Sequence, residues 1–282
     1  MSYLSKIENR EIKIISIAEA ADYNLLPSNT PVQNSIALRA IIVANIAGAF
    51  TIINIPAGVY QFDGTVVSLD GVDGLIFEGQ LGTTFQIDAD EPIFDTRNQG
   101  NVIKNIQFKK IKFENIHVNA SSDHLVNAGL IYCGGGILEN ALVEDCVFTG
   151  PGVDLNGFKT ANGTSSGLGD KYVRNLTFNR CRFENLGRMG IELFHGGDIT
   201  IFDVVLTNNV FDNVGVFGNH QIAVSLAGPG ENISCYNTTF RNIPQVGFEN
   251  VGPDNVVYSH TFFDSDTGRG FGISDPLNTS KN

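Results

Sequence analysis

The feature that most constrains the fold is a repeated unit in the C-terminal two-thirds of the chain. From about Val102 onward, short apolar segments recur, each with a phenylalanine at the same place and an Asn- or Gly-containing turn after it. The shared residues are Phe113, Phe148, Phe183, Phe211, Phe240 and Phe263, at intervals of 35, 35, 28, 29 and 23 residues. Two residues before four of them stand Cys146, Cys181, Asn209 and Thr238. Both positions should therefore stack as ladders inside a coil.

Each unit reads as a short strand, a turn, a second short strand and a connecting loop. One such unit cannot bury its apolar face alone, but coils stacked at about 4.8 Å close a continuous core. An antiparallel sandwich would instead show hairpin signals between adjacent strands, and a barrel of alternating strands and helices would need one helix per repeat. The sequence predicts an all-β, single-stranded, right-handed parallel β-helix.

Composition agrees with this fold and excludes several functions. Charged residues make up only 17% of the 282 residues, whereas the chain has 31 Gly and 20 Phe, which favours strands over helices. The net charge of −12 argues against a nucleic acid or an anionic membrane as partner. The sequence contains no run of 18 apolar residues, so we predict no membrane span. The four cysteines lack metal-site spacing, so we expect buried free thiols, with no metal and no cofactor.

The N-terminal part, residues 1–65, is predicted to hold a lead-in strand (11–17), one helix and the first coil. Residues 66–282 form the β-helix body of the same single domain. Thr30, Pro31 and Gln33 form a capping box with proline at the first helical position, which starts a helix over 31–46. Its buried face is predicted to hold Val32, Ile36, Ala40 and Ile41. Strand, turn and strand follow in "FTIINIPAGVYQF".

This order resembles the opening of the pectate-lyase-like β-helix superfamily, as bacteriophage tailspikes and polysaccharide depolymerases use it. The segments that carry the resemblance are "DYN", the capped helix and "IPAGVYQF". The resemblance implies a polysaccharide partner, a homotrimer, and a location in a virion tail or outside the cell; no secretion signal is recognisable at the start. The family's acidic "GDGxTDDT" segment is replaced here by "LLPSNTPVQNS", so inferences from those acids do not transfer. Phe194, Phe202 and Phe217 exceed what one narrow core needs and favour an interface.

One outward column of the predicted strands is acidic. In "MGIELFHG" the alternation points Ile191 inward and Glu192 outward, because successive side chains of a strand alternate faces. The alignment of the repeats places Val153, Ile222, Phe248 and Phe271 beside Ile191. The outward residues that follow are Asp154, Glu192, Ala223, Glu249 and Gly272. The sequence thus predicts a row of carboxylates along one outer face.

This row has the spacing that glycoside hydrolysis needs. Asp154 and Glu192 would be one coil, about 5 Å, apart, and Glu192 and Glu249 two coils, about 10 Å, apart. Retaining enzymes need about 5–5.5 Å and inverting enzymes about 6.5–9.5 Å. A like charge one coil away should also raise one carboxyl pKa, as a general acid requires. We assign Glu192 as general acid, Asp154 as its closer partner and Glu249 as alternative base. The competing interpretation is that an acidic chain aligns surface carboxylates by chance.

Three residues in turns near this row are candidates for substrate binding. His195 follows Glu192 by three residues, and His220 precedes the equivalent strand of the next coil. Arg188 lies in the turn before Glu192 and would suit a carboxylated sugar. The competing interpretation is that His195 is a turn residue without function and that Arg188 is simply solvated.

The long loop over 156–172 supplies further candidates, since long loops in compact folds are usually functional or disordered. Phe158 would stack on a sugar ring, and Lys159 and Lys171 would wall a groove. Tyr132, one coil earlier, is the analogous aromatic residue. The "NTD", "DD" and "RIK" segments of polygalacturonases are missing, so no family motif assigns the substrate.

The predicted function is a tailspike-type depolymerase, an enzyme that cleaves glycosidic bonds of a bacterial surface polysaccharide as a glycoside hydrolase. Three alternatives stay open: a polysaccharide lyase, a non-catalytic glycan-binding module for receptor recognition, and a structural scaffold. Two carboxyl groups at hydrolase distance would favour the enzyme, whereas scattered acids beneath a flat aromatic surface would favour binding alone.

Overall fold

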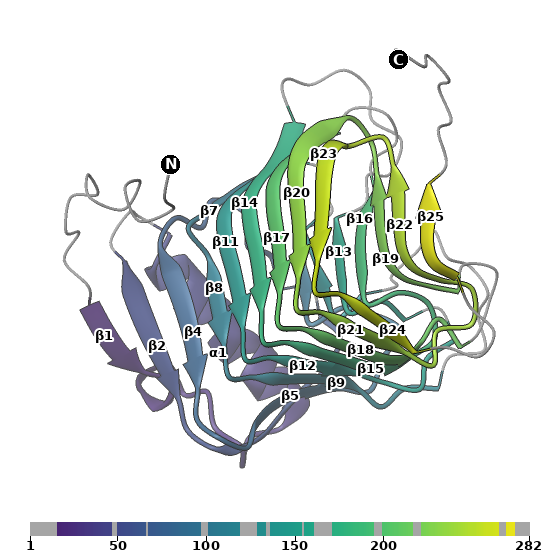
Figure 1. The fold of residues 1–282 in the computed structure, drawn as a ribbon. Helices are drawn as coiled ribbons and strands as arrows, with labels where there is room; N and C mark the ends of the chain where they lie inside the picture. Colours follow the sequence, from purple (N-terminus) through teal and green to yellow (C-terminus); the bar gives the residue numbers. More distant parts are fainter. Residues whose placement is uncertain are drawn as a thin grey trace.

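A computed structural model describes residues 16–46, 50–65, 67–96, 101–118, 129–133, 136–153, 155–160, 171–194, 199–216, 221–264 and 269–273. Its strands pair only in parallel and form sheets of ten, eight and seven strands (Figure 1). The ten-stranded sheet holds β1 Ser16–Glu19, β2 Thr51–Ile55, β4 Leu75–Gly79, β7 Val102–Lys104, β8 Gln107–Lys109, β11 Ile137–Glu144, β14 Lys171–Asn179, β17 Ile199–Thr207, β20 Gly230–Tyr236 and β23 Asp254–Ser259.

The other two sheets complete each coil. The eight-stranded sheet holds β3 Gly58–Phe62, β5 Thr83–Ile87, β9 Lys112–Asn115, β12 Val147–Thr149, β15 Arg182–Leu186, β18 Val210–Val214, β21 Thr239–Arg241 and β24 Phe262–Asp264. The seven-stranded sheet holds β6 Phe94–Asp95, β10 Ile131–Tyr132, β13 Phe158–Thr160, β16 Ile191–Phe194, β19 Ile222–Ala227, β22 Val246–Val251 and β25 Arg269–Ile273.

The chain visits the three sheets in turn, so that β14, β15 and β16 make one coil and β17, β18 and β19 make the next (Figure 1). Each strand pairs with its counterpart one coil away, and one apolar cluster runs between the sheets. Parallel connections of this kind are right-handed in nearly all proteins. The predicted fold class, a right-handed parallel β-helix with an N-terminal helix, is confirmed.

The predicted phenylalanine ladder is present. Strand register places each of the six residues directly beside the next, from β9 to β24. Neighbouring rings lie 4.7–5.1 Å apart with interplanar angles of 4–18°. Such stacked pairs contribute roughly 0.5–1.5 kcal/mol beyond the area that they bury. The ladder therefore fixes the register of successive coils.

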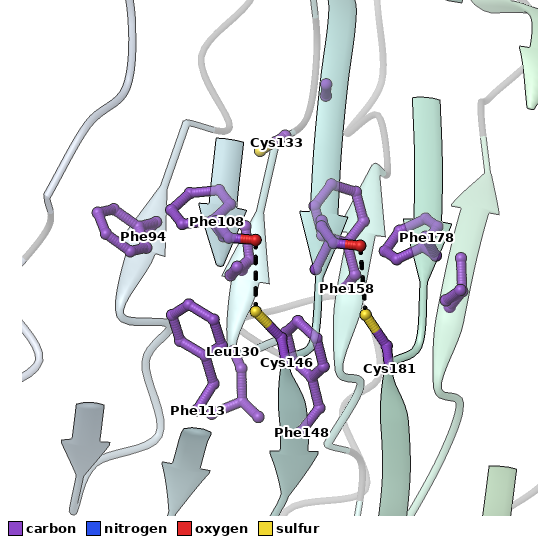
Figure 2. Close-up of a cluster of buried hydrophobic side chains, with 14 of the residues drawn as sticks. Phe94, Phe108, Phe113, Leu130, Cys133, Cys146, Phe148, Phe158, Phe178 and Cys181 are labelled. Carbon is purple, nitrogen blue, oxygen red and sulfur yellow. Dashed lines mark hydrogen bonds between the residues drawn. The ribbon is translucent and has the colours of Figure 1, made fainter. Parts of the chain in front are cut away.

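The ladder two residues earlier satisfies backbone carbonyls that face the core. The Cys146 thiol donates to the carbonyl of Phe108 at 3.4 Å, and the Cys181 thiol donates to that of Val143 at 3.3 Å (Figure 2). In the next coil the Asn209 amide donates to the equivalent carbonyl at 3.0 Å. All four cysteines are free and buried, as predicted. Burial raises the pKa of the Cys146 thiol to about 12, which keeps it protonated and a poor nucleophile.

The N-terminal helix α1, Pro31–Ala44, lies against the first coil at one end of the solenoid (Figure 1). The predicted capping box is confirmed, because the Thr30 and Gln33 side chains each bond the other's backbone amide. The predicted buried face is wrong except at Ile41. Val32 is 53% exposed and Ile36 is 59% exposed. The apolar residues that α1 buries are Ala37, Leu38, Ile41 and Ile42. The helix is apolar on both faces, so periodicity could not choose between them. Most of the predicted strand 11–17 lies outside the described residues.

Asparagines in the left-handed backbone conformation, at positions inside neighbouring strands, form a further ladder on the surface. Asn140 and Asn175, at φ values of 56° and 54°, are joined by a 2.9 Å bond from the Asn175 amide to the Asn140 side-chain oxygen. Asparagine tolerates this backbone region because its short polar side chain bonds locally, whereas other residues with a Cβ are strained there.

We expect Asn175→Ala to destabilise the protein by about 1–2 kcal/mol, the cost of a left-handed residue with a Cβ, together with the lost bond. Asn175→Gly is the matched variant, because it loses the same bond but adopts the left-handed conformation without strain. Chemical denaturation should rank the wild type above the glycine variant, and the glycine variant above the alanine variant. Equal losses in both variants would show that backbone strain contributes nothing at this position.

Of the three residues that favoured an interface, Phe202 is described. Its half-buried ring lies 5.1 Å from the guanidinium of Arg174, which also stacks on Tyr172 at 4.8 Å. The half-buried Phe202 ring therefore has a partner within the chain. The Phe194 side chain and Phe217 lie outside the described residues, and the homotrimer stays a prediction.

Candidate functional site

Strand register assembles one polar column on the outer face of the seven-stranded sheet. From β6 to β22 its members are Asp95, Tyr132, Lys159, Glu192, Ser225 and Glu249. The residue before Glu192, Ile191, lies in the core beside Phe158 and Val224, so the column points away from the core. The predicted outward row around Glu192 therefore exists, with Glu249 two strands away as expected.

Two members of the predicted row are wrong. Lys159, not Asp154, occupies the position beside Glu192 on β13, because that strand begins at Phe158 and not near Val153. On the other side Glu192 pairs with Ser225, not Ala223. On β19 the error is a shift of two residues, which keeps every side chain on the same face of the sheet, so the alternating pattern cannot detect it. Asp154 itself lies outside the described residues.

Glu192 is the centre of a buried network of ions. It is 4% exposed, and its Oε2 accepts three hydrogen bonds or ion pairs. Arg188 Nη1 lies at 2.6 Å, Asn156 Nδ2 at 2.9 Å and Lys159 Nζ at 3.2 Å. Lys159 and Arg188 are themselves buried. All three contacts are made to Oε2. Among the described residues, none donates a hydrogen bond to the other carboxylate oxygen, Oε1.

The charges around Glu192 keep it ionised. Burial alone would raise the pKa of this carboxyl, but the opposing charges and hydrogen bonds of Lys159 and Arg188 outweigh it and lower the pKa below its usual range. The predicted raised pKa is wrong, because the neighbour along the column is a cation and not the expected carboxylate. At neutral pH Glu192 therefore has no proton to donate, and the general-acid role does not fit it.

Lys159 and Phe158 also differ from their predicted places. Both belong to β13 and not to the wall of a loop. Phe158 points into the core, where it is 1% exposed and packs edge-on against Phe178 at 5.1 Å, so it cannot stack on a sugar. Lys159 faces outward, and its Nζ lies 5.5 Å from the ring centroid of Tyr132. Tyr132 thus joins the site, but as the neighbour of a buried cation.

Glu249 is the second carboxylate of the column. It is half-buried on β22, and its Oε2 accepts a hydrogen bond from the Ser225 hydroxyl at 2.6 Å. Two strand spacings separate Glu192 from Glu249, which puts their backbones about 10 Å apart. Ser225 occupies the strand between them. This separation leaves room for a sugar or a water molecule between the two carboxyl groups.

Sequence reasoning missed three residues of the site. Asn156 is fully buried and bonds Glu192; it belongs to an Asn-Gly pair that we interpreted as a loop. Ser225 was missed because the register was taken two residues early. Asp95, at the far end of the column, follows an inward Phe94 as Glu192 follows Ile191, so the same apolar-acidic pattern was the available signal.

The remaining candidates are not brought into the site by the described residues. His195 and His220 lie outside them. Lys171 opens β14, on a different sheet, and its side chain is not described. Arg188 is the one turn candidate that the structure places at Glu192.

Burial distinguishes this column from other outward positions. On the eight-stranded sheet the equivalent outward acids, Glu114, Glu184 and Asp212, are half-buried, as Glu249 is. On the seven-stranded sheet Lys159, Glu192 and Ser225 are each 4% exposed. Burying charges costs several kcal/mol per ion, so a buried ion network is weak evidence for stability. It is typical instead of a site where charges are held for chemistry or recognition.

The described residues show neither a metal centre nor a membrane helix. In those parts of the chain, no group of three or more His, Cys, Asp or Glu side chains gathers at a metal-binding distance. No helix among them has both the length and the apolar character to cross a bilayer.

Comparison with known proteins finds solved structures of similar fold but identifies no family for this chain. No protein-family model matches the chain, and no curated protein matches it by sequence. A pectate lyase variant from Xanthomonas campestris matches 96% of this chain and 82% of its own at 12% identity, with a TM-score of 0.40. A mannuronan C-5 epimerase A-module from Azotobacter vinelandii matches 92% and 100% at 13% identity, with a TM-score of 0.35. The Streptococcus pneumoniae surface adhesin PfbA matches 94% and 96% at 10% identity, with a TM-score of 0.36. Likeness at this level carries no inference about activity.

Proposed function

We propose that this protein is a carbohydrate-active enzyme that cleaves a polysaccharide along the polar column of the seven-stranded sheet. The observation that carries the proposal is the pair of carboxylates, one ionised and held by Lys159 and Arg188, the other two strands away across Ser225. A solenoid face of this kind is long enough to lie along several sugar units of a chain.

The geometry favours glycoside hydrolysis with inversion. In that mechanism one carboxyl group protonates the leaving oxygen and the other activates water, with about 6.5–9.5 Å between them. Glu192 is ionised and so takes the second role, through the Oε1 that the three donors leave unbonded. Glu249 is then the proton donor, with Ser225 orienting it. This exchanges the roles that the sequence suggested for the two residues.

A polysaccharide lyase is the second candidate, because two buried cations lie beside Glu192. A lyase removes a proton next to a sugar carboxylate, and Lys159 and Arg188 would stabilise the negative charge that develops there. Products separate the candidates: hydrolysis leaves saturated reducing ends, whereas elimination leaves an unsaturated sugar that absorbs ultraviolet light.

The biological setting follows from the tailspike resemblance. We propose a bacterial capsule or O-antigen polysaccharide as the substrate, a homotrimer as the assembly, and a virion tail or extracellular location. Sedimentation at micromolar concentration tests the assembly: a species of 30.5 kDa alone would contradict the trimer.

Incubating the protein with a panel of bacterial surface polysaccharides should release reducing ends from at least one of them. Glu249→Gln should reduce turnover of that polysaccharide by about 10²–10⁴-fold, the usual contribution of general acid–base catalysis. Its melting temperature should change little, because Glu249 is half-buried and bonds a neutral hydroxyl. The matched control is Glu184→Gln, an equally half-buried carboxylate on the eight-stranded sheet, which should keep full activity. Full activity of Glu249→Gln would remove this residue from the mechanism.

A further inference from the structure

Only some of the hydrogen-bond donors of the Arg188 guanidinium have an acceptor within the chain. Its Nη1 donates to Glu192 at 2.6 Å, yet its Nε is buried without an acceptor, and its side chain is 7% exposed. In the part of the chain that the structure describes, Nη2 donates to no acceptor either. Nε and Nη2 form one edge of the planar guanidinium, and that edge matches the two oxygens of a carboxylate.

Other arginines of this protein show what such an edge normally holds. Arg180 donates from Nε and Nη2 to the two oxygens of Asp145, at 2.7 and 3.0 Å. Arg182 donates from the same two atoms to Glu184. Arg241 also has an unbonded Nε, but its Nη2 pairs with Asp212 at 3.1 Å and its side chain is 40% exposed. Arg188 is therefore distinct among these four in having a buried edge without a carboxylate.

The turn that carries Arg188 is fixed in place. The Arg188 amide donates to the Leu155 carbonyl at 3.1 Å, and the Met189 amide donates to the Asn156 side-chain oxygen at 3.0 Å. Asn156 also bonds Glu192, so one buried amide positions both the turn and the carboxylate. A guanidinium held in this way loses little freedom when a ligand binds.

The ion pair with Glu192 uses only one corner of the Arg188 guanidinium. Glu192 Oε2 accepts from Nη1, and the buried Nε on the other edge has no acceptor. A buried donor without an acceptor is costly, and such a group in a folded protein calls for a partner.

We propose that the Nε–Nη2 edge of Arg188 is a subsite for the carboxylate of an acidic sugar, so that the polysaccharide contains uronic acid. This inference rests on the proposed function and adds the substrate class to it. The carboxylate completes the guanidinium as Asp145 completes Arg180, while Lys159 and Nη1 remain on Glu192.

The test compares acidic oligosaccharides with neutral copies of themselves. Oligoglucuronate and oligogalacturonate of four to six sugars, each in native and carboxyl-reduced form, are titrated into the protein by calorimetry. We expect the wild type to bind at least one native form about 10–100-fold more tightly than its reduced form, the usual effect of hydrogen bonds to a charged group. Arg188→Lys should lose most of that preference, because it keeps the charge but not the two-donor edge. Arg241→Lys, the control with an unbonded Nε outside the site, should keep it.

Each possible outcome either supports or overturns the carboxylate subsite at Arg188. Equal binding of native and reduced forms by the wild type overturns the inference even if Arg188→Lys fails to fold. Retention of the full preference by a folded Arg188→Lys overturns it as well. Cleavage of neutral polysaccharides alone overturns the subsite and leaves the proposed function standing, whereas absence of both binding and cleavage on every glycan removes the two together.

Discussion

Replacing Glu192 by glutamine should abolish most activity and also destabilise the fold. The variant keeps the shape of the side chain but removes the negative charge that Lys159 and Arg188 contact, so both buried cations lose this ion pair. Breaking a buried ion pair from one side typically costs about 3–5 kcal/mol. Loss of the ionised carboxylate should lower turnover by about 10²–10⁴-fold as well. Chemical denaturation and product assays on the same preparation measure the two effects.

The pH dependence of stability checks the same ion network. The pKa of Glu192 is lower in the folded protein than its ordinary value of 4.5. Its contribution is therefore complete above the unfolded-state pKa and is lost as the pH falls through the lower folded-state pKa. In the Glu192→Gln variant this part of the acid-induced loss should disappear.

Two controls make these results interpretable. Glu249→Gln should lose activity but keep stability, since Glu249 is half-buried and pairs with no cation in the described residues. A Glu192→Gln, Lys159→Met double variant should recover part of the lost stability, because it removes one of the two buried cations that lost the Glu192 charge. If Glu192→Gln is as stable as the wild type, the ion network does not hold the site as described.

Replacing Phe183 by alanine should be among the most damaging changes in the core. Phe183 is fully buried, and its ring is stacked between Phe148 at 4.8 Å and Phe211 at 4.7 Å. Removing such a ring leaves a cavity and typically costs about 3–5 kcal/mol. Phe262→Ala on β24 is the matched control, because Phe262 is 58% exposed and a surface substitution usually changes stability by less than about 0.5 kcal/mol. Guanidinium chloride unfolding measures both. If the two variants lose similar amounts of unfolding free energy, the stacked phenylalanine ladder is not a main source of stability for the coils.

The sequence was sufficient for the parts of the fold where one residue type recurs at one structural position. The phenylalanine ladder and the thiol and amide ladder beside it survive changes in loop length, because each strand pairs directly with its copy one coil away. The Thr30 cap was predictable for a local reason, since the capping box involves residues only three positions apart.

The rest depends on information that a local pattern does not carry. The alignment of Ala223 with Glu192 failed because a shift of two residues preserves the alternation of strand faces. The start of β13 was misplaced because the turn before it has no strand periodicity, so Lys159 was assigned to a loop. The wrong direction predicted for the Glu192 pKa followed from that error, because the neighbour expected to be an acid is the cation Lys159. The buried face of α1 could not be chosen either, because both faces are apolar.

We propose that the polar column of the seven-stranded sheet binds and cleaves the polysaccharide. The most direct test is a crystal structure of the Glu249→Gln variant soaked with an oligosaccharide that the wild type cleaves. We expect a sugar chain across Lys159, Glu192 and Ser225, with the glycosidic oxygen facing residue 249 and a sugar carboxylate on Arg188. Sugar density confined to the eight- or ten-stranded sheet, with the column empty, would contradict it.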